Sequence, residues 1–140
     1  MSDTLEFAAS RDQQQAWKHQ AIRAYAVAFL TAGLALIDNG VTYCGSDDVP
    51  DDAVPQSEED HGIPGSAAMM LINAHLITRR YDLTIPDRGI FGGRRKSKRE
   101  SANGRSVPVY SINRGLAELW LTRNGVSLGE RQQDFWARVG

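Results

Sequence analysis

The chain has 140 residues, of which 41% are apolar, and its formal net charge is −1. This length is typical of one domain, and this apolar content is enough for a buried core. Cys44 is the only cysteine, which excludes an intrachain disulfide and a thiolate metal cluster. We interpret it as a small buried residue in a reducing compartment. The first residues lack the order of a signal peptide, so we expect a cytoplasmic protein.

Charged residues are distributed unevenly along the chain. Residues 46–60 contain acids and no Lys or Arg: Asp47, Asp48, Asp51, Asp52, Glu58, Glu59 and Asp60. Residues 79–105 contain nine bases against Asp82, Asp87 and Glu100. Such asymmetry suggests that the basic part binds a polyanion. The alternative is that the two blocks neutralise each other or are simply solvated.

Residues 12–38 have the composition of a helix, with apolar residues on two stripes. The run from Ala24 to Ile37 carries no charge, but it is shorter than the roughly 20 residues that a membrane span requires. We therefore expect a central core helix in a soluble protein and no membrane segment. Asn39-Gly40 is expected to end this helix, because both residues tolerate a left-handed conformation.

Residues 41–75 predict a short strand and two further helices. Val41 to Tyr43 alternate as a strand does, and the hydroxyl of Ser46 is expected to cap a helix with acids in its first turn. A later helix is expected to begin near Pro64. At helical spacing it presents an inward face and an outward face. The inward residues are Ala67, Ala68, Leu71, Ile72 and Ala74; the outward ones are Ser66, Met69 or Met70, and Asn73.

Residues 97–126 predict a hairpin followed by a helix. Asn103-Gly104 is a strong signal for a two-residue turn. The returning strand contains Pro108, which restricts it to an edge of a sheet. A helix with Leu116, Leu119 and Trp120 then closes the domain. Ser127-x-x-Glu130 predicts a capping box for a last short helix that contains Phe135 and Trp136.

The expected fold is therefore α+β and mainly helical, with the order helix, strand, helix, helix and two-stranded wing. We assign residues 12–124 to a winged helix-turn-helix domain, 125–140 to an additional C-terminal helical extension, and 1–11 to a flexible N-terminus. Three stretches, VTYCGSDDVPDDAVP, IPGSAAMMLINAHLI and NGRSVPVYSI, resemble the first motif helix with its preceding strand, the second helix, and the return strand of small phage-type winged-helix proteins. This resemblance covers residues 17–112.

The resemblance implies that residues 66–75 are a recognition helix and that residues 90–112 are a wing. DNA would contact this helix through Ser66, Met70 and Asn73. Of these, Asn73 alone offers the hydrogen bonds that read adenine. Most of the affinity is therefore expected from wing bases that contact phosphate or enter the minor groove, namely Arg94, Arg95, Lys96, Lys98, Arg99 and Arg105.

No pattern of catalytic or metal-binding residues stands out. Adjacent carboxylates such as Asp47 and Asp48 point in different directions on a helix, so they are not expected to converge on a metal. The three histidines lack ligand spacing, and GIFGGRR lacks the Gly-Lys-Ser/Thr of a phosphate-binding loop. We expect neither an enzyme nor a cofactor.

Two functions remain open. The first is a small DNA-binding protein, phage-encoded, that acts in transcription regulation or as a recombination accessory and binds duplex DNA. The second is a protein-protein interaction or scaffold module that uses the Met69/Met70 surface, or pairs its acidic and basic parts in a homodimer. The polarised charge fits both.

Overall fold

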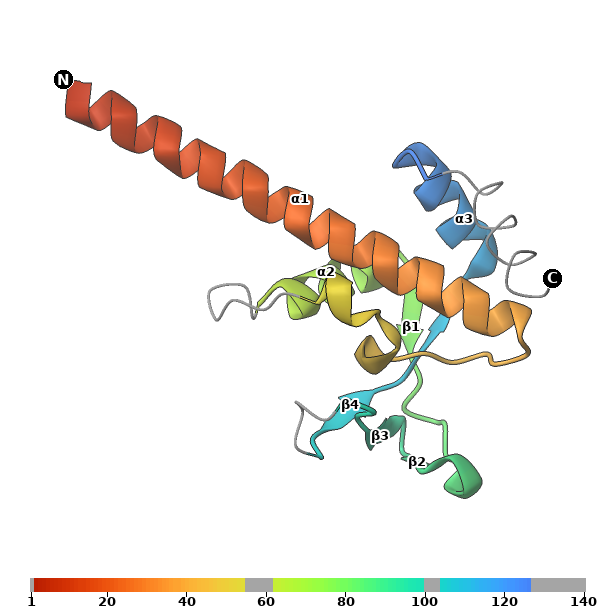
Figure 1. The fold of residues 1–140 in the computed structure, drawn as a ribbon. Helices are drawn as coiled ribbons and strands as arrows, with labels where there is room; N and C mark the ends of the chain where they lie inside the picture. Colours follow the sequence, from red (N-terminus) through yellow and green to blue (C-terminus); the bar gives the residue numbers. More distant parts are fainter. Residues whose placement is uncertain (1, 55–61, 100–103, 127–140) are drawn as a thin grey trace.

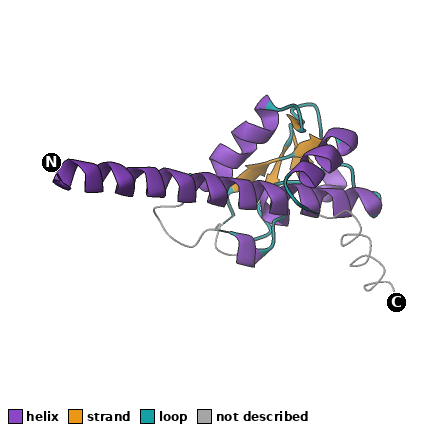
Figure 2. Ribbon diagram, turned by 90° about the horizontal axis from the view of Figure 1, so that it is seen from above, coloured by secondary structure: helices purple, strands orange, loops and turns teal. Residues whose placement is uncertain are grey.

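A long helix, α1, runs through the molecule. The computed structural model describes residues 2–54, 62–99 and 104–126, and α1 spans Ser2–Asp38. The C-terminal half of α1 crosses the body, whereas its N-terminal half extends beyond it (Figures 1 and 2). The helix therefore begins earlier than the predicted Asp12. Its ridge of buried residues, among them Ala26, Leu30 and Leu34, confirms the prediction of a core helix.

The core lies where α1 meets α2 (Ile63–Asn73), the strands beside them and α3 (Arg114–Arg123). The ring centroids of Phe29 and Tyr110 are 5.9 Å apart in an edge-to-face arrangement, which ties α1 to the sheet. Cys44 is 2% exposed, and burial raises the pKa of its thiol to about 12, so the thiol stays protonated at neutral pH. The prediction of a buried cysteine is confirmed.

The segment Lys18–Asp38 of α1 is long and apolar enough to cross a membrane, with a mean hydropathy of 1.5. The same segment supplies Tyr25, Phe29 and Leu30 to the core. A core helix of a soluble protein meets the same criteria of length and composition, so the structure is compatible with a soluble protein.

Helix ends follow local sequence signals. Gly40 has a φ of +85° after α1, and the backbone N–H of Val41 donates to Leu36 O at 2.8 Å, which is a Schellman arrangement. The predicted stop at Asn39-Gly40 is thus confirmed. The end of α2 has the same arrangement, with Leu76 N donating to Leu71 O at 2.9 Å. There, however, the left-handed residue is His75, with a φ of +63°.

The helix predicted to begin at Ser46 is wrong. Two short 3₁₀ helices, η1 (Ser46–Asp48) and η2 (Asp51–Ala53), stand in its place. Pro50 explains the break, since a residue before proline avoids the helical conformation, and Val49 is extended with a ψ of 132°. Ser46 does not cap η1 either, because the cap position is Gly45. The Gln/Ser/Glu-rich loop that follows lies largely outside the described residues.

The strands form two small antiparallel sheets. β1 (Ile77–Arg79) pairs with β5 (Tyr110–Ile112), and β2 (Ile90–Phe91), β3 (Arg94–Lys96) and β4 (Ser106–Pro108) form a second sheet in the order β2-β3-β4. A 3₁₀ helix, η4 (Pro86–Arg88), precedes β2. The strand predicted at Val41–Tyr43 is reduced to an isolated bridge between Cys44 and Tyr110.

The predicted hairpin is confirmed in its strands, because β3 and β4 pair with Lys96 opposite Ser106. Pro108 lies on β4, which is an edge strand as expected. Asn103 lies outside the described residues, so the type of the Asn103-Gly104 turn stays a prediction. In contrast to the predicted two-stranded wing, a third strand, β2, joins the sheet through the pair Phe91–Arg94. We call the β2-β3-β4 sheet the wing sheet; it lies at the end of the body away from α3 (Figure 1).

The helix predicted after Asn113 is confirmed as α3. The Asn113 side chain accepts a hydrogen bond from Leu116 N at 3.2 Å and caps it. Ala117 and Leu121 are buried and Trp120 packs against the core, whereas Leu116 and Leu119 are 41% and 47% exposed. The predicted capping box at Ser127–Glu130 and its short helix lie outside the described residues. The described part of the chain is thus α+β, as predicted.

Candidate functional site

Strand β3 divides the predicted DNA-binding bases between two environments. Side chains alternate along a strand, so Arg94 and Lys96 lie on one face of the wing sheet and Arg95 on the other. Arg94 and Lys96 are exposed to solvent, whereas the Arg95 side chain is only 11% exposed. The outer face therefore carries accessible positive charge, and the inner face directs its arginine toward the acidic residues of η1.

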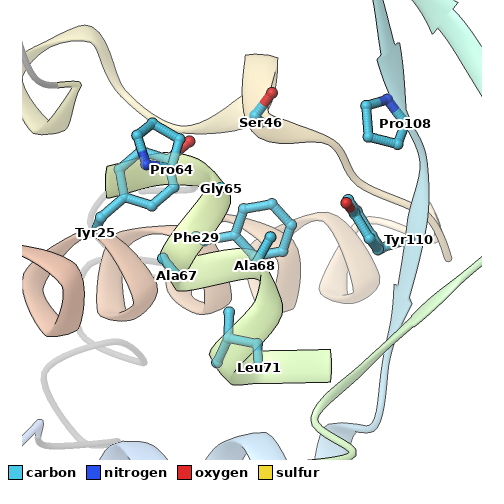
Figure 3. Close-up of a pocket in the computed structure, with 10 residues that line it drawn as sticks. All are labelled: Tyr25, Phe29, Ser46, Pro64, Gly65, Ala67, Ala68, Leu71, Pro108 and Tyr110. Atoms are coloured by element: carbon cyan, nitrogen blue, oxygen red, sulfur yellow. The ribbon is translucent and has the colours of Figure 1, made fainter. Parts of the chain in front are cut away.

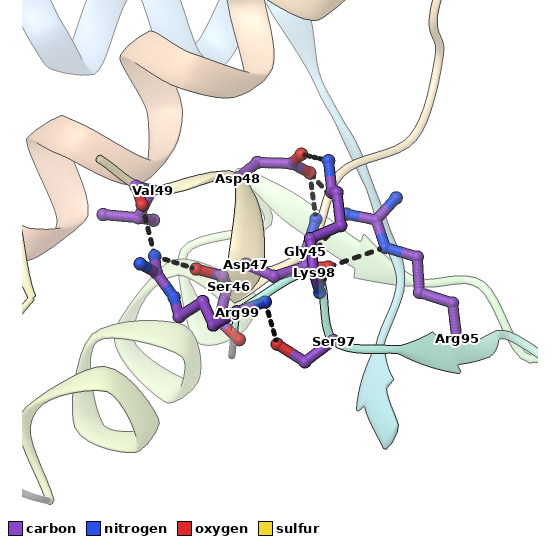
Figure 4. A network of polar contacts seen from close by, with 9 residues as sticks. All are labelled: Gly45, Ser46, Asp47, Asp48, Val49, Arg95, Ser97, Lys98 and Arg99. Atoms are coloured by element: carbon purple, nitrogen blue, oxygen red, sulfur yellow. Dashed lines mark hydrogen bonds and ion pairs between the residues drawn. The ribbon is translucent and has the colours of Figure 1, made fainter. Parts of the chain in front are cut away.

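Arg95 and Asp47 form a buried, two-point ion pair (Figure 4). Arg95 Nη2 donates to Asp47 Oδ1 at 2.6 Å, and Arg95 Nε donates to Asp47 Oδ2 at 3.2 Å. The Asp47 side chain is 0% exposed, and its Oδ2 also accepts from the backbone N–H of Lys98 at 3.1 Å. A planar guanidinium matched to a carboxylate is the strong, geometrically specific form of such a pair.

Two further bases join the same network, which we call the η1–wing network (Figure 4). Asp48 accepts from Arg95 Nη2 at 2.7 Å and pairs with Lys98 Nζ. Arg99 donates to the backbone carbonyls of Ser46 and Val49 and forms an ion pair with Asp51. Asp47, Asp48 and Asp51 therefore fasten the wing to the body, which agrees with the alternative that the acidic and basic blocks neutralise each other.

The electrostatics of Asp48 agree with this network. Burial of the carboxyl is the largest influence and acts to raise its pKa. Hydrogen bonds from Lys98, from the backbone N–H of Gly45 at 2.8 Å and from Arg95 outweigh burial, and the pKa falls below its usual range. For Arg95, burial opposes the charged form, but hydrogen bonds from its guanidinium to Asp47 and Asp48 leave its pKa raised. Asp48 and Arg95 are therefore both charged at neutral pH.

Of the six predicted wing bases, three are thus engaged within the chain and three point outward. Arg95, Lys98 and Arg99 belong to the η1–wing network, although the Lys98 side chain is still 58% exposed. Arg94, Lys96 and Arg105 are exposed. Arg94 also donates to Ser106 Oγ at 2.9 Å and to Ser106 O at 3.0 Å, which fixes its guanidinium across the hairpin.

A shallow basic cleft adjoins the network. It has a volume of about 360 Å³, and Arg88 and Lys96 bring accessible positive charge to it. Arg88 lies at the end of η4 and was not among the predicted site residues. The further lining residues are Leu36, Val41, Tyr43, Asp48, Gly89, Arg95 and Lys98.

The predicted recognition helix α2 presents a neutral surface. Ser66 and Asn73 are exposed as expected. Of the two methionines, Met69 is the outward one at 56% exposure, whereas Met70 packs against the core. Ala67 and Leu71 face the core, and at 100° per residue Met70 falls at the edge of that buried face, so Met70 is less accessible than Met69 while its contact with DNA stays a prediction.

An apolar pocket of about 200 Å³ opens beside the N-terminus of α2 (Figure 3). Tyr25 and Phe29 of α1 lie on one side of it, and Pro108 and Tyr110 lie on another (Figure 3). The remaining lining residues are Ser46, Pro64, Gly65, Ala67, Ala68 and Leu71. A small apolar group would fit it, and among the described residues no charged side chain lines it.

Comparisons with protein-family models, with curated proteins and with solved structures gave no match to this chain. Sequence reasoning missed two exposed aromatic residues near the wing sheet, Tyr81 and Phe91, which are 70% and 60% exposed. A signal for Phe91 was present in GIFGGRR, because a strand that buries Ile90 must present Phe91 on its other face.

Proposed function

We propose that this protein binds duplex DNA through the outer face of its wing sheet. One observation carries the proposal: β3 exposes Arg94 and Lys96 on one face, while Arg95 on the other face is paired with Asp47 and Asp48. Positive charge is thereby concentrated on an accessible surface of a molecule whose net charge is only −1. A row of cations on an accessible edge is the usual footprint of phosphate binding.

The scaffold that we propose is a winged helix-turn-helix. In its favour, α2 is followed directly by strands that lead into the hairpin, and α1 packs along α2. Within the described residues the first motif helix is represented only by η1 and η2. This departure shifts the expected binding further from α2 to the wing sheet.

The arrangement favours affinity over sequence readout. Four accessible basic side chains on or beside the wing sheet would contact phosphate: Arg88, Arg94, Lys96 and Arg105. The exposed residues of α2 are neutral, and Asn73 is the one suited to a bidentate contact with adenine. Phosphate contacts position a protein without specifying sequence. We therefore expect weak discrimination between sequences, as in a regulatory or recombination accessory protein of phage type in the cytoplasm, with no enzymatic step.

The test is fluorescence anisotropy of the full chain with a labelled random duplex at low salt. Replacing Arg94 and Lys96 together by Gln should weaken binding at least tenfold. The matched control replaces Arg23 and Arg123, exposed bases on α1 and α3, by Gln; it changes the net charge equally and should leave affinity within about twofold. Absence of binding by the wild-type protein, or equal losses in both variants, would refute the proposal.

A protein partner is the second candidate, favoured by the apolar pocket between α1, α2 and β4 (Figure 3). Exposed Met69 on α2 adds an adaptable apolar side chain to that helix. The pairing of acidic and basic parts gives this candidate less support than the sequence did, because Asp47 and Asp48 are satisfied within the chain. A Met69→Asp variant that keeps full DNA affinity but loses a protein partner would favour it.

A further inference from the structure

Two large aromatic side chains near the wing sheet are exposed to solvent. Tyr81 follows β1, and Phe91 ends β2; they are 70% and 60% exposed. Single exposed apolar residues are common on protein surfaces and carry no meaning alone. These two residues, however, belong to segments that contact each other directly and that carry several arginines.

Gly93 brings the two segments together. It lies two residues after Phe91 and has a φ of +74°, and a Cβ added to it would lie 2.1 Å from the carbonyl oxygen of Arg80 and 2.9 Å from the Cα of Tyr81. The backbone N–H of Gly93 also donates to Leu83 O at 2.8 Å. The turn after Phe91 is therefore packed against the backbone at Tyr81, and the two segments that carry the exposed rings lie side by side.

Each aromatic residue has an arginine beside it. The guanidinium carbon of Arg79 lies 4.6 Å from the centroid of the Tyr81 ring, a cation–π distance. Phe91 is the cross-strand partner of Arg94, so these two side chains project from the same face of the sheet. Arg94 is held in place by its two hydrogen bonds to Ser106. Exposed rings next to arginine side chains match a ligand that has both planar faces and negative charge.

We propose that Tyr81 and Phe91 stack on unpaired bases of a nucleic acid strand whose phosphates are held by the neighbouring arginines. Single-stranded DNA has this chemistry, since its bases present free faces and its backbone is anionic. In a B-form duplex the faces of the bases are covered by their neighbours, so the two rings gain little from duplex binding. This proposal rests on the proposed function, in which the wing sheet binds nucleic acid.

Stacking and charge make different contributions to the salt dependence of binding. Phosphate contacts set the slope of log affinity against log salt, whereas base stacking changes affinity without releasing counterions. Loss of an aromatic ring should therefore lower the affinity for single-stranded DNA by the same factor at every salt concentration, without changing the slope of log affinity against log salt. Loss of an arginine should change the slope. This distinction separates a stacking site from a general weakening of the wing sheet.

The experiment compares labelled oligothymidylate with a random duplex of the same length, each titrated with the full chain over a salt series. Tyr81→Ala and Phe91→Ala should each weaken binding to oligothymidylate about fivefold or more at every salt concentration, as expected for loss of one stacked base. Duplex affinity should stay within about twofold. Phe91→Tyr should bind oligothymidylate as the wild type does, because any aromatic ring can stack.

The matched controls are Leu116→Ala and Leu119→Ala, which remove comparably exposed apolar side chains from α3 and should change neither affinity. Urea unfolding of each variant checks that the fold is retained. If wild-type protein binds the duplex but not oligothymidylate, or if the aromatic variants lose both ligands equally, the stacking proposal is wrong while the proposed function stands. If Arg94→Gln with Lys96→Gln leaves duplex binding intact, it is the proposed function that fails.

Discussion

Arg95 of β3 reaches Asp47 of η1 across 48 positions of sequence, with Nη2 2.6 Å from Oδ1 and Nε 3.2 Å from Oδ2. Both side chains are nearly inaccessible to solvent. The contact joins the wing sheet to the segment that follows α1, and it withdraws one arginine from the surface that we propose for DNA. In the proposed function, stability and DNA binding are thus divided between adjacent residues of one short strand.

The first prediction concerns this pair. Arg95→Met should cost about 3–5 kcal/mol of unfolding free energy, because it leaves the buried Asp47 carboxylate without its partner. Arg94→Met, one residue earlier and exposed, should cost less than about 1 kcal/mol. Urea unfolding followed by circular dichroism measures both values. Equal losses would show that the η1–wing network does not stabilise the fold.

The second prediction concerns pH. The folded-state pKa of Asp48 lies below its unfolded value of 3.8, so this group contributes stability above about pH 4. That contribution should be lost as the pH falls from 3.8 through the lowered folded-state pKa. An Asp48→Asn variant should lack this component, so its unfolding free energy should depend less steeply on pH in the acid range. Parallel curves for the two proteins between about pH 5 and pH 2 would contradict the assignment.

The third prediction concerns the turn between β2 and β3. Gly92 and Gly93 both have positive φ, +57° and +74°, as a two-residue type I′ turn requires. Gly92→Ala should cost about 1 kcal/mol of unfolding free energy, because alanine is strained at this φ. No clash adds to this cost, since no atom lies within 4 Å of the added Cβ. Gly93→Ala should cost about 3 kcal/mol, because it adds a backbone clash to the same conformational penalty. Thermal or urea unfolding of the two variants would reveal the difference, and equal costs would exclude the close approach at Tyr81.

The fourth prediction concerns the residue after α2. His75 has a φ of +63°, and glycine adopts this conformation without a steric penalty. His75→Gly should therefore stabilise the protein by about 0.5–1 kcal/mol, whereas His75→Val should destabilise it by about 1–2 kcal/mol. Ala74→Gly, at an ordinary φ of −86°, serves as control and should not stabilise. A loss of stability in His75→Gly would mean that the histidine side chain makes a contribution greater than the strain.

The helix ends and the hairpin could be predicted from sequence because their causes are local. Asn39-Gly40 stops α1, Asn113 caps α3, and Pro108 keeps β4 at an edge. The signal for the β2–β3 turn is equally local, since Gly92-Gly93 suits a type I′ turn, although no turn was predicted from GIFGGRR. Pro50 was a similar local warning against a continuous helix from Ser46.

The partition of the basic residues could not be predicted in the same way. The sequence pattern of an acidic block and a basic block is the same whether the two blocks pair in the fold or face solvent. The pairing of Arg95 with Asp47 depends on how β3 packs against η1, which is a long-range property. The face of a strand on which each base lies also depends on register, and a shift of one residue would exchange Arg94 and Arg95.

In the proposed function, Arg94 and Lys96, rather than Arg95, provide phosphate contacts. The most direct measurement is duplex affinity over a salt series for the wild type and the Arg94→Gln/Lys96→Gln variant. With Arg88 and Arg105 contributing as well, the wild-type log–log slope should be roughly −3 to −4, at about −0.9 for each phosphate contact. The variant slope should be smaller in magnitude by about two. A variant whose slope equals that of the wild type would contradict the account.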